Sequence, residues 1–402
     1  MKIKFIIKTI VFLFAVFGLC AFIFPKISSL TVPVLQPEKA ADAEDAEART
    51  AEKAEIPASI LLQAKEAAAA LGVDALAAQV IMTGVDANGF LGEAEKAVLS
   101  AVPAGAVMLF RKNLTAPVDG IIQTNMEISA VISASCGIKP FIAVDHEGGD
   151  VQRFTNAAAL PPPLSYWEKA QTDGWETAIL QIKTDAAYSG AELRKMGVNL
   201  NLAPVAEIFT AENAGFLKSR SYGPAAAFVE KAAASFAAGM EESGVLCVVK
   251  HFPGNSSQDP HVSKPVWNAD IDTLKSLTSP FSYYFKTFPA GAVMISHVIV
   301  SAWDGEQNAS LSPQVIKRLR EEYGFNGLII ADDFSMGAVS GGLATEEYAV
   351  RALKSGVDMV MSWPANYRST HNAIVRAVEN SGLPKERLLE AAARVIAAKH
   401  LL

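Results

Sequence analysis

The feature that most constrains the fold is a series of eight short apolar segments separated by longer amphipathic or alanine-rich ones. Each apolar segment is bounded by turn residues, which is typical of strands buried on both faces of a parallel sheet. Eight strands with helical crossovers predict an α/β chain folded as a (β/α)8 TIM barrel. An open doubly wound sheet is the alternative, but no GxGxxG motif follows any of the segments. The predicted strands are Ala78–Val85, Gly105–Phe110, Pro140–Asp145, Val198–Pro204, Val245–Lys250, Ala292–His297, Gly327–Asp332 and Val357–Ser362, and the clearest helices are Ala225–Ser243, Ser312–Tyr323 and Thr345–Ser355.

The N-terminus has the pattern of an export signal. Lys2, Lys4 and Lys8 precede the apolar run Thr9–Phe24, which gives a basic region followed by a hydrophobic one. With Phe5–Ile7 included, the apolar stretch approaches the length that spans a bilayer. The positive charges would keep the N-terminus inside and place the rest of the chain outside.

Residues 1–25 are therefore predicted to be a signal peptide or a membrane anchor that precedes the barrel. No clear small-x-small cleavage site follows, which favours a retained anchor over a cleaved signal. Lipidation at Cys20 is a third reading, although Leu19 is a poor residue just before such a cysteine. Each reading predicts an exported protein, either membrane-anchored or periplasmic or extracellular.

The next segment, residues 26–56, is rich in Ala and Glu and is predicted to be a linker, because it has little to bury. The folded barrel domain is predicted to span 57–402. The net charge of −7 and the pI near 5.5 argue against nucleic acid as a partner, because nucleic-acid binders normally show a basic face.

Polar side chains collect where the predicted strands end. In a barrel, the carboxyl ends of the strands carry the active site. Repeated placement of acids, histidines and a lysine on most strands favours an active site over polar residues that merely end strands. These residues are Asp145, His146, Glu147, Arg153, Glu207, Lys250, His251, Asp259, His261, His297, Asp332 and Asp333.

This polar rim does not have the pattern of a metal site. Consecutive residues of a strand point to opposite faces, so in the sequence Asp145, His146, Glu147 only the two acids share a face. No Cys/His spacing typical of zinc occurs either. We expect neither a metal nor another cofactor.

The rim suits glycoside hydrolysis, which needs a carboxylate at the anomeric carbon and a proton donor at the leaving oxygen. Asp332 and Asp333 are adjacent, so we expect only one of them to face the site. His261 is a candidate proton donor, and Asp259 lies two residues away, where it could orient the imidazole.

Several motifs resemble glycoside hydrolase family 3, specifically its single-domain bacterial β-N-acetylglucosaminidases of the NagZ type. They are VDHEGGDVQRF, VNLNLAPVAE with SRSYG, KHFPG, SLSP, and GFNGLII with ADDFSM, and the resemblance covers roughly residues 71–402. It implies a retaining mechanism with a covalent intermediate, Asp332 as the nucleophile and an Asp-His pair, Asp259 and His261, as the acid/base. It also implies that the sugar is bound by Asp145, Arg153, Arg220, Lys250 and His251.

The loop after the fifth strand departs from the family pattern. It reads KHFPGNSSQDPH, two residues shorter than usual, with Asn255-Ser256 in place of a His-Gly pair. Pro260 stands where the family has a small hydroxyl residue, Asp150 where Arg is common, and Glu207 where Asp is common. These changes put the delivery of His261 to the leaving oxygen in question.

The leading hypothesis is a hydrolase that removes terminal β-linked N-acetylglucosamine from cell-wall fragments or other glycans. One alternative is a family 3 glycosidase with another sugar preference or with phosphate as acceptor. Another is a catalytically impaired sugar-binding protein at the cell surface. The expected partners are a GlcNAc-containing glycan or muropeptide and, through the N-terminal segment, a membrane, with the chain itself a monomer.

Overall fold

The computed structural model describes residues 57–154, 157–255, 265–335 and 343–402. The predicted signal or anchor, the linker, and the residues Asp259 and His261 lie outside these ranges. Within them, no helix is both long and apolar enough to cross a membrane.

Eight parallel strands form the central sheet in the order β10-β1-β2-β3-β4-β5-β7-β9. A parallel bridge between Ile330 and Met359 joins the two outer strands and closes the barrel. The predicted TIM barrel is confirmed. The strands are β1 (Ile81–Gly84), β2 (Ala106–Leu109), β3 (Phe141–Val144), β4 (Leu200–Asn201), β5 (Leu246–Phe252), β7 (Ala292–Ile295), β9 (Leu328–Ala331) and β10 (Val360–Met361).

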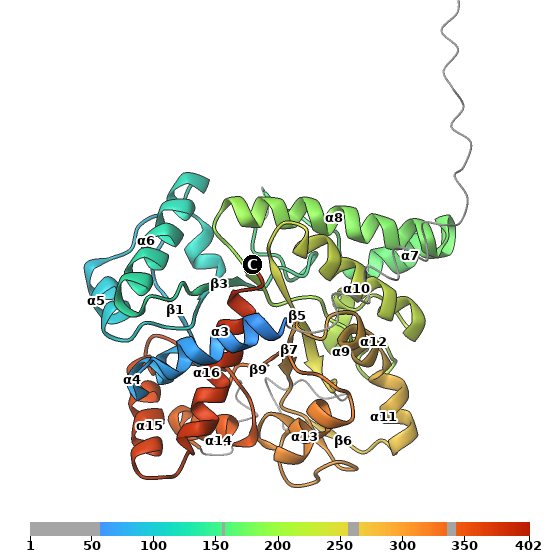
Figure 1. The fold of residues 1–402 in the computed structure, drawn as a ribbon. Helices are drawn as coiled ribbons and strands as arrows, with labels where there is room; N and C mark the ends of the chain where they lie inside the picture. The colour runs from blue at the N-terminus through green and yellow to red at the C-terminus, as the bar shows by residue number, and fades with distance from the viewer. Residues whose placement is uncertain (1–56, 155–156, 256–264, 336–342) are drawn as a thin grey trace, which may run out of the picture. The chain divides into compact units, whose positions relative to one another are not determined.

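Helices connect these strands and cover the outside of the barrel (Figure 1). The three helices named from the sequence are confirmed as α10, α13 and α14. The helices are α3 (Ala58–Ala69), α4 (Val73–Gln79), α5 (Glu93–Ala101), α6 (Val118–Cys136), α7 (Pro163–Asp173), α8 (Trp175–Lys195), α9 (Ala214–Leu217), α10 (Ala226–Glu241), α11 (Ile271–Leu277), α12 (Ser279–Thr287), α13 (Pro313–Glu321), α14 (Thr345–Ser355), α15 (Tyr367–Glu379) and α16 (Lys385–Lys399).

The prediction of a strand over Ala78–Val85 is wrong at its start, because Ala78 and Gln79 end helix α4. An apolar run alone does not distinguish the end of a buried helix from a strand. A second, two-stranded sheet of β6 (Val266–Trp267) and β8 (Ile299–Val300) was also not predicted.

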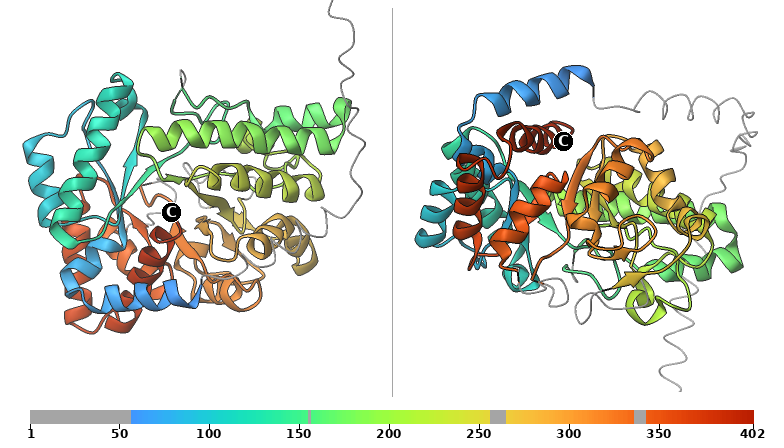
Figure 2. Two further views of the ribbon diagram at one scale, coloured as in Figure 1. Left: turned by 45° about the horizontal axis from the view of Figure 1, so that its top comes forward. Right: turned by 90° about the horizontal axis from the view of Figure 1, so that it is seen from below.

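Packing between distant parts of the chain completes the barrel. Helix α3 packs against α16, so the first and last described helices lie side by side (Figures 1 and 2). Helices α8 and α10 likewise run alongside each other. The barrel interior is filled by residues that alternate along each strand, such as Met82 of β1, Met108 of β2 and Ile330 of β9.

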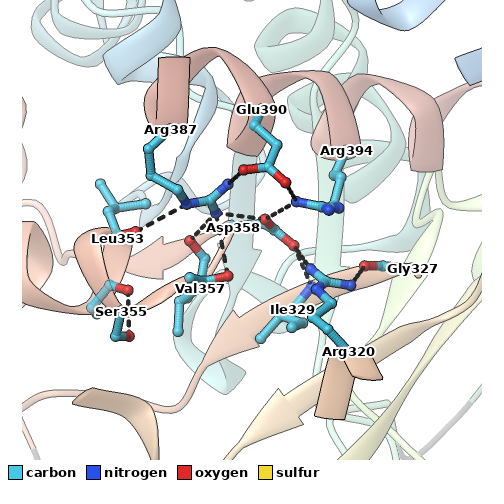
Figure 3. Close-up of polar contacts among 12 residues, drawn as sticks. Arg320, Gly327, Ile329, Leu353, Ser355, Val357, Asp358, Arg387, Glu390 and Arg394 are labelled. Carbon is cyan, nitrogen blue, oxygen red and sulfur yellow. Dashed lines mark hydrogen bonds and ion pairs between the residues drawn. The ribbon is translucent and has the colours of Figure 1, made fainter. Parts of the chain in front are cut away.

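A buried ion network ties α13 and α16 to the start of β10 (Figure 3). Asp358 is fully buried, and its carboxylate contacts Arg320 at 2.6 Å, Arg387 at 2.7 Å and Arg394 at 3.3 Å. Glu390 bridges the two arginines of α16 at 2.7 Å each. Burial alone would raise the pKa of Asp358, but the three arginines hold it below its usual range. The network therefore keeps its carboxylate ionised.

Candidate active site

The alternation of inward and outward side chains along the strands brings the predicted site residues to one end of the barrel interior. Inward positions on β3, β5 and β9 are apolar up to Ala143, Val248 and Ile330. The next inward positions, two residues further on, are Asp145, Lys250 and Asp332. The sequence therefore changes from apolar to charged where the interior reaches the carboxyl ends of the strands.

Lys250 is the centre of a charged network. Its Nζ lies 2.7 Å from Asp145 Oδ1 and 2.6 Å from Glu147 Oε1. Arg220 donates to both oxygens of Glu147, from Nε at 2.8 Å and from Nη2 at 2.9 Å. The role of Glu147 was not predicted, although its sharing a face with Asp145 is confirmed.

Burial and ion pairing act against each other in this network. Burial alone would raise the pKa of Glu147, but Lys250 and Arg220 hold it well below its usual range. Burial would lower the pKa of Lys250, but Asp145 and Glu147 raise it above its ordinary value. Glu147 and Lys250 are therefore charged at neutral pH, and they form an ion pair within reach of a sugar.

Arg153 lies at the edge of the same network. Its Nη2 contacts Asp145 Oδ2 at 3.3 Å, and its buried Nε has no hydrogen-bond partner in the part of the chain that the structure describes. A buried donor without an acceptor is costly. A ligand oxygen at this position would satisfy it.

His251 is oriented by a carboxylate behind it. Its Nδ1 lies 2.7 Å from Glu207 Oε1, and because a carboxylate only accepts, Nδ1 carries the proton. Asn255 donates its backbone N–H to Glu207 Oε2 at 2.6 Å and its side-chain amide to Oε1 at 3.0 Å. The opposite ring nitrogen, Nε2, is thereby fixed in direction. No sequence pattern predicted the contribution of Asn255.

The structure gives the adjacent acids Asp332 and Asp333 different surroundings. Asp332 Oδ1 accepts the backbone N–H of Asp333 at 2.8 Å. The Asp333 carboxylate instead accepts the Trp363 indole N–H, with both oxygens at 3.0 Å, and the Ser335 N–H and O–H at 2.8 Å. The Asp333 carboxylate is thus bonded within its own turn and to Trp363, two residues after β10, whereas Asp332 keeps an oxygen free of these bonds.

Asp332 is held in its ionised form. Burial alone would raise its pKa, but the neighbouring His251, the Asp333 amide and the Lys250 ammonium lower it below the usual range of an aspartate. A carboxylate that stays ionised in a partly buried position is suited to attack an electrophilic carbon.

His297 supports the turn after β9. Its Nε2 lies 3.1 Å from the Asp333 carbonyl oxygen and its Nδ1 2.8 Å from Ser310 Oγ. Because a carbonyl only accepts, Nε2 carries the proton and Nδ1 accepts from the hydroxyl. Burial lowers the pKa of His297, in agreement with a neutral ring.

A cavity of about 590 Å³ lies beside this site, with Glu207, Asn255 and Trp267 in its lining. Among the described residues, no group of three or more His, Cys, Asp or Glu side chains is arranged to hold a metal ion. The structure thus brings Asp145, Arg153, Arg220, Lys250, His251 and Asp332 together.

Comparison with known proteins agrees with this geometry. Residues 73–398 match the model of the glycosyl hydrolase family 3 N-terminal domain. A β-hexosaminidase of Tolumonas auensis is 32% identical over 296 residues, which cover 71% of this chain and 83% of the relative. The β-hexosaminidase LpqI of Mycobacterium tuberculosis is 32% identical over 241 residues, 58% of this chain and 61% of the relative.

Solved structures have the same fold. A family 3 β-N-acetylglucosaminidase from Paenibacillus superposes with a TM-score of 0.76 at 26% identity, covering 83% of this chain and 63% of that one. NagZ from Neisseria gonorrhoeae in complex with N-trifluoroacetyl-D-glucosamine superposes with a TM-score of 0.66 at 26% identity, covering 79% of this chain and 89% of that one.

Proposed function

The chain belongs to glycosyl hydrolase family 3, and from this premise we propose that it removes terminal β-linked N-acetylglucosamine from glycans with retention of configuration. The observation that carries the proposal is the ionised Asp332 beside the network of Asp145, Lys250 and His251. Related β-hexosaminidases and the NagZ complex with a GlcNAc analogue support the sugar.

In the first step, an oxygen of Asp332 attacks the anomeric carbon as the bond from that carbon to the leaving oxygen breaks. The leaving oxygen takes a proton from the general acid, which gives a covalent glycosyl-enzyme. In the second step water attacks the same carbon, its proton passes to the base, and the bond to Asp332 breaks. Two inversions give net retention.

We assign the proton transfers to His261, with Asp259 as its orienting carboxylate. The support is the order of residues in the loop after β5, which is similar to the Asp-His pair of the family. Because an imidazole has a pKa near neutrality, it can give a proton in the first step and take one in the second.

The sugar-binding roles follow from the charges in the network. Asp145 can accept from sugar hydroxyls, whereas Arg153 and Lys250 can donate to them. His251 presents Nε2 to the sugar, because its Nδ1 is bonded to Glu207. Arg220 uses Nε and Nη2 on Glu147, which leaves Nη1 as its donor toward a sugar.

We further propose that the natural substrates are cell-wall fragments, including muropeptides, that the protein meets outside the cytoplasm. The support is the basic and apolar pattern of residues 1–25, which suits export with a retained membrane anchor. The linker of residues 26–56 would then space the barrel from the membrane.

The test is hydrolysis of 4-nitrophenyl β-N-acetylglucosaminide beside the matching β-glucoside. Selective release from the first compound is expected. Equal release from both would point to another sugar preference. Binding of N-acetylglucosamine without turnover would favour a sugar-binding protein and overturn the proposed hydrolase.

A further inference from the structure

Two aromatic residues stand in the same inward layer as the charged site residues. Phe110 follows Met108 of β2 by two residues, and Trp363 follows Met361 of β10 by two. Both rings are partly exposed and pack on the residues of the barrel interior. The alternation that directs Asp332 inward therefore directs these rings inward as well.

The aromatic residues occupy the arc of the barrel between the nucleophile and the sugar-binding acid. The strands along this arc are β9, β10, β1, β2 and β3, in that order with the barrel closed between β9 and β10. Their inward residues at the carboxyl ends are, in sequence, Asp332, Trp363, Gly84, Phe110 and Asp145. Two further predicted sugar-binding residues, Lys250 and His251, lie across the mouth on β5.

The two rings form one surface over Gly84. Their centroids are 4.9 Å apart with an interplanar angle of 76°. A Cβ on Gly84 would lie 3.4 Å from Phe110 Cε2 and 3.6 Å from Trp363 Cε3, so both rings pack closely on this glycine. Between Asp332 and Asp145, the inward positions thus present apolar ring surface and a glycine in place of charged groups.

Trp363 also fixes the turn that carries the nucleophile. Its Nε1 donates to both oxygens of Asp333 at 3.0 Å, and the Asp333 N–H donates to Asp332 at 2.8 Å. The ring of Trp363 and the carboxylate of Asp332 are therefore linked through a single intervening residue.

We propose that Phe110 and Trp363 form the apolar wall of the sugar site, and that Trp363 positions Asp332 through Asp333. The inference rests on the proposed function, because it places a pyranose between Asp332 and Asp145. The hydroxyls of the pyranose contact the charged groups. The edge of the sugar that faces away from Lys250 and His251 packs its C–H groups against the two rings. Aromatic rings bind such surfaces because they remove apolar area from water without demanding hydrogen bonds.

The test measures the Kd of N-acetylglucosamine by calorimetry, together with kcat and KM for its 4-nitrophenyl β-glycoside. Phe110→Ala removes the ring without touching Asp333. Phe110→Leu keeps apolar volume and serves if the alanine variant folds poorly. Trp363→Phe keeps a ring but removes the N–H that holds Asp333. Tyr188→Ala and Trp175→Phe on α8, with side chains 64% and 38% exposed, are matched controls.

Both Phe110 variants should weaken N-acetylglucosamine binding and raise KM about threefold to tenfold, with kcat little changed. Trp363→Phe should leave the Kd near that of the wild type and lower kcat about tenfold. The controls should match the wild type.

Unchanged Kd in both Phe110 variants would overturn the wall, and unchanged kcat in Trp363→Phe would overturn its positioning role. Failure of the proposed function would give a different result, because the wild-type protein would then bind N-acetylglucosamine without hydrolysing its glycoside. The Kd values of the Phe110 variants would still test the apolar wall in that case.

Discussion

Asp332 and Asp333 are identical side chains on adjacent residues, and their hydrogen bonds give them different roles. Asp333 accepts bonds from Trp363 and Ser335, so its carboxylate is committed to holding the turn. Asp332 accepts one backbone N–H and keeps a lowered pKa. The sequence predicted that only one acid would face the site, and the family pattern chose the first. The partners of the second come from residues up to 30 positions away, which spacing alone does not predict.

Replacing Asp332 by Asn should reduce kcat by about 10⁴-fold or more, because the amide cannot form the covalent intermediate. Steady-state kinetics on the 4-nitrophenyl substrate measures this loss. Asp333→Asn is the matched comparison and should cost much less, because it weakens the turn but leaves the nucleophile. Near-normal turnover by Asp332→Asn would contradict the assignment.

The lowered pKa of Asp332 predicts the acid limb of the pH profile. Only the ionised carboxylate attacks, and its pKa lies below the ordinary aspartate value of about 3.9. The fall in kcat/KM that protonation of Asp332 causes should therefore lie below about pH 4. The test measures kcat/KM against pH, with circular dichroism at each pH to show that the protein stays folded. A loss of activity near pH 6 that is caused by protonation of Asp332 in folded protein would refute the prediction.

The strands and helices were predicted well where periodicity is strong, and less well where tertiary contacts decide. Seven of the eight barrel strands lie within the predicted segments, and β5 runs past the end of its segment to Phe252. β4 and β10 are only two residues long. Helix α13 begins where Ser312 Oγ accepts the Val315 N–H and Pro313 takes the first turn, a signal visible in the sequence. The sheet of β6 and β8 has two-residue strands, too short for any period.

At the scale of the helices and strands, the Asp358 network is predicted to raise the free energy of unfolding. It lies at the end of the barrel away from the site. Asp358→Ala should lower the free energy of unfolding by about 3–5 kcal/mol, because it leaves three partly buried arginines without their common partner. Glu379→Ala, on the exposed surface of α15, should change it by about 0.5 kcal/mol or less. Urea unfolding followed by circular dichroism compares the two, and equal effects would contradict the role of the network.

The Asp358 network also predicts how the free energy of unfolding changes with pH. The folded pKa of Asp358 is lowered, so its contribution to stability is fully present above the unfolded pKa and is lost as pH falls through the folded value. The wild type should therefore lose stability on acidification, and Asp358→Ala should lose less over the same range. Parallel losses in both proteins would show that other groups dominate.

At the scale of the whole molecule, the sequence predicted a barrel whose charged mouth binds a sugar. The alternation along the strands would also have found Phe110 and Trp363, since each follows an inward methionine by two residues. It could not have found the bridge from Lys250 to Glu147, because these residues are 103 positions apart and their pairing depends on the closed barrel.

The proposed division into anchor, linker and barrel predicts separable behaviour. Full-length protein should sediment with membranes, whereas residues 57–402 alone should stay in the supernatant with the same kcat/KM. Fractionation followed by an activity assay of both forms measures this. Full-length protein found only in the supernatant with its N-terminus intact would contradict a retained anchor.

The most direct test of the central claim is to trap the covalent intermediate with a fluorinated N-acetylglucosaminyl substrate that slows the second step. Peptide mapping by mass spectrometry should then find one sugar attached to Asp332, and the product formed without the trap should retain the β configuration. An adduct on another carboxylate, or an inverted product without any adduct, would contradict the mechanism.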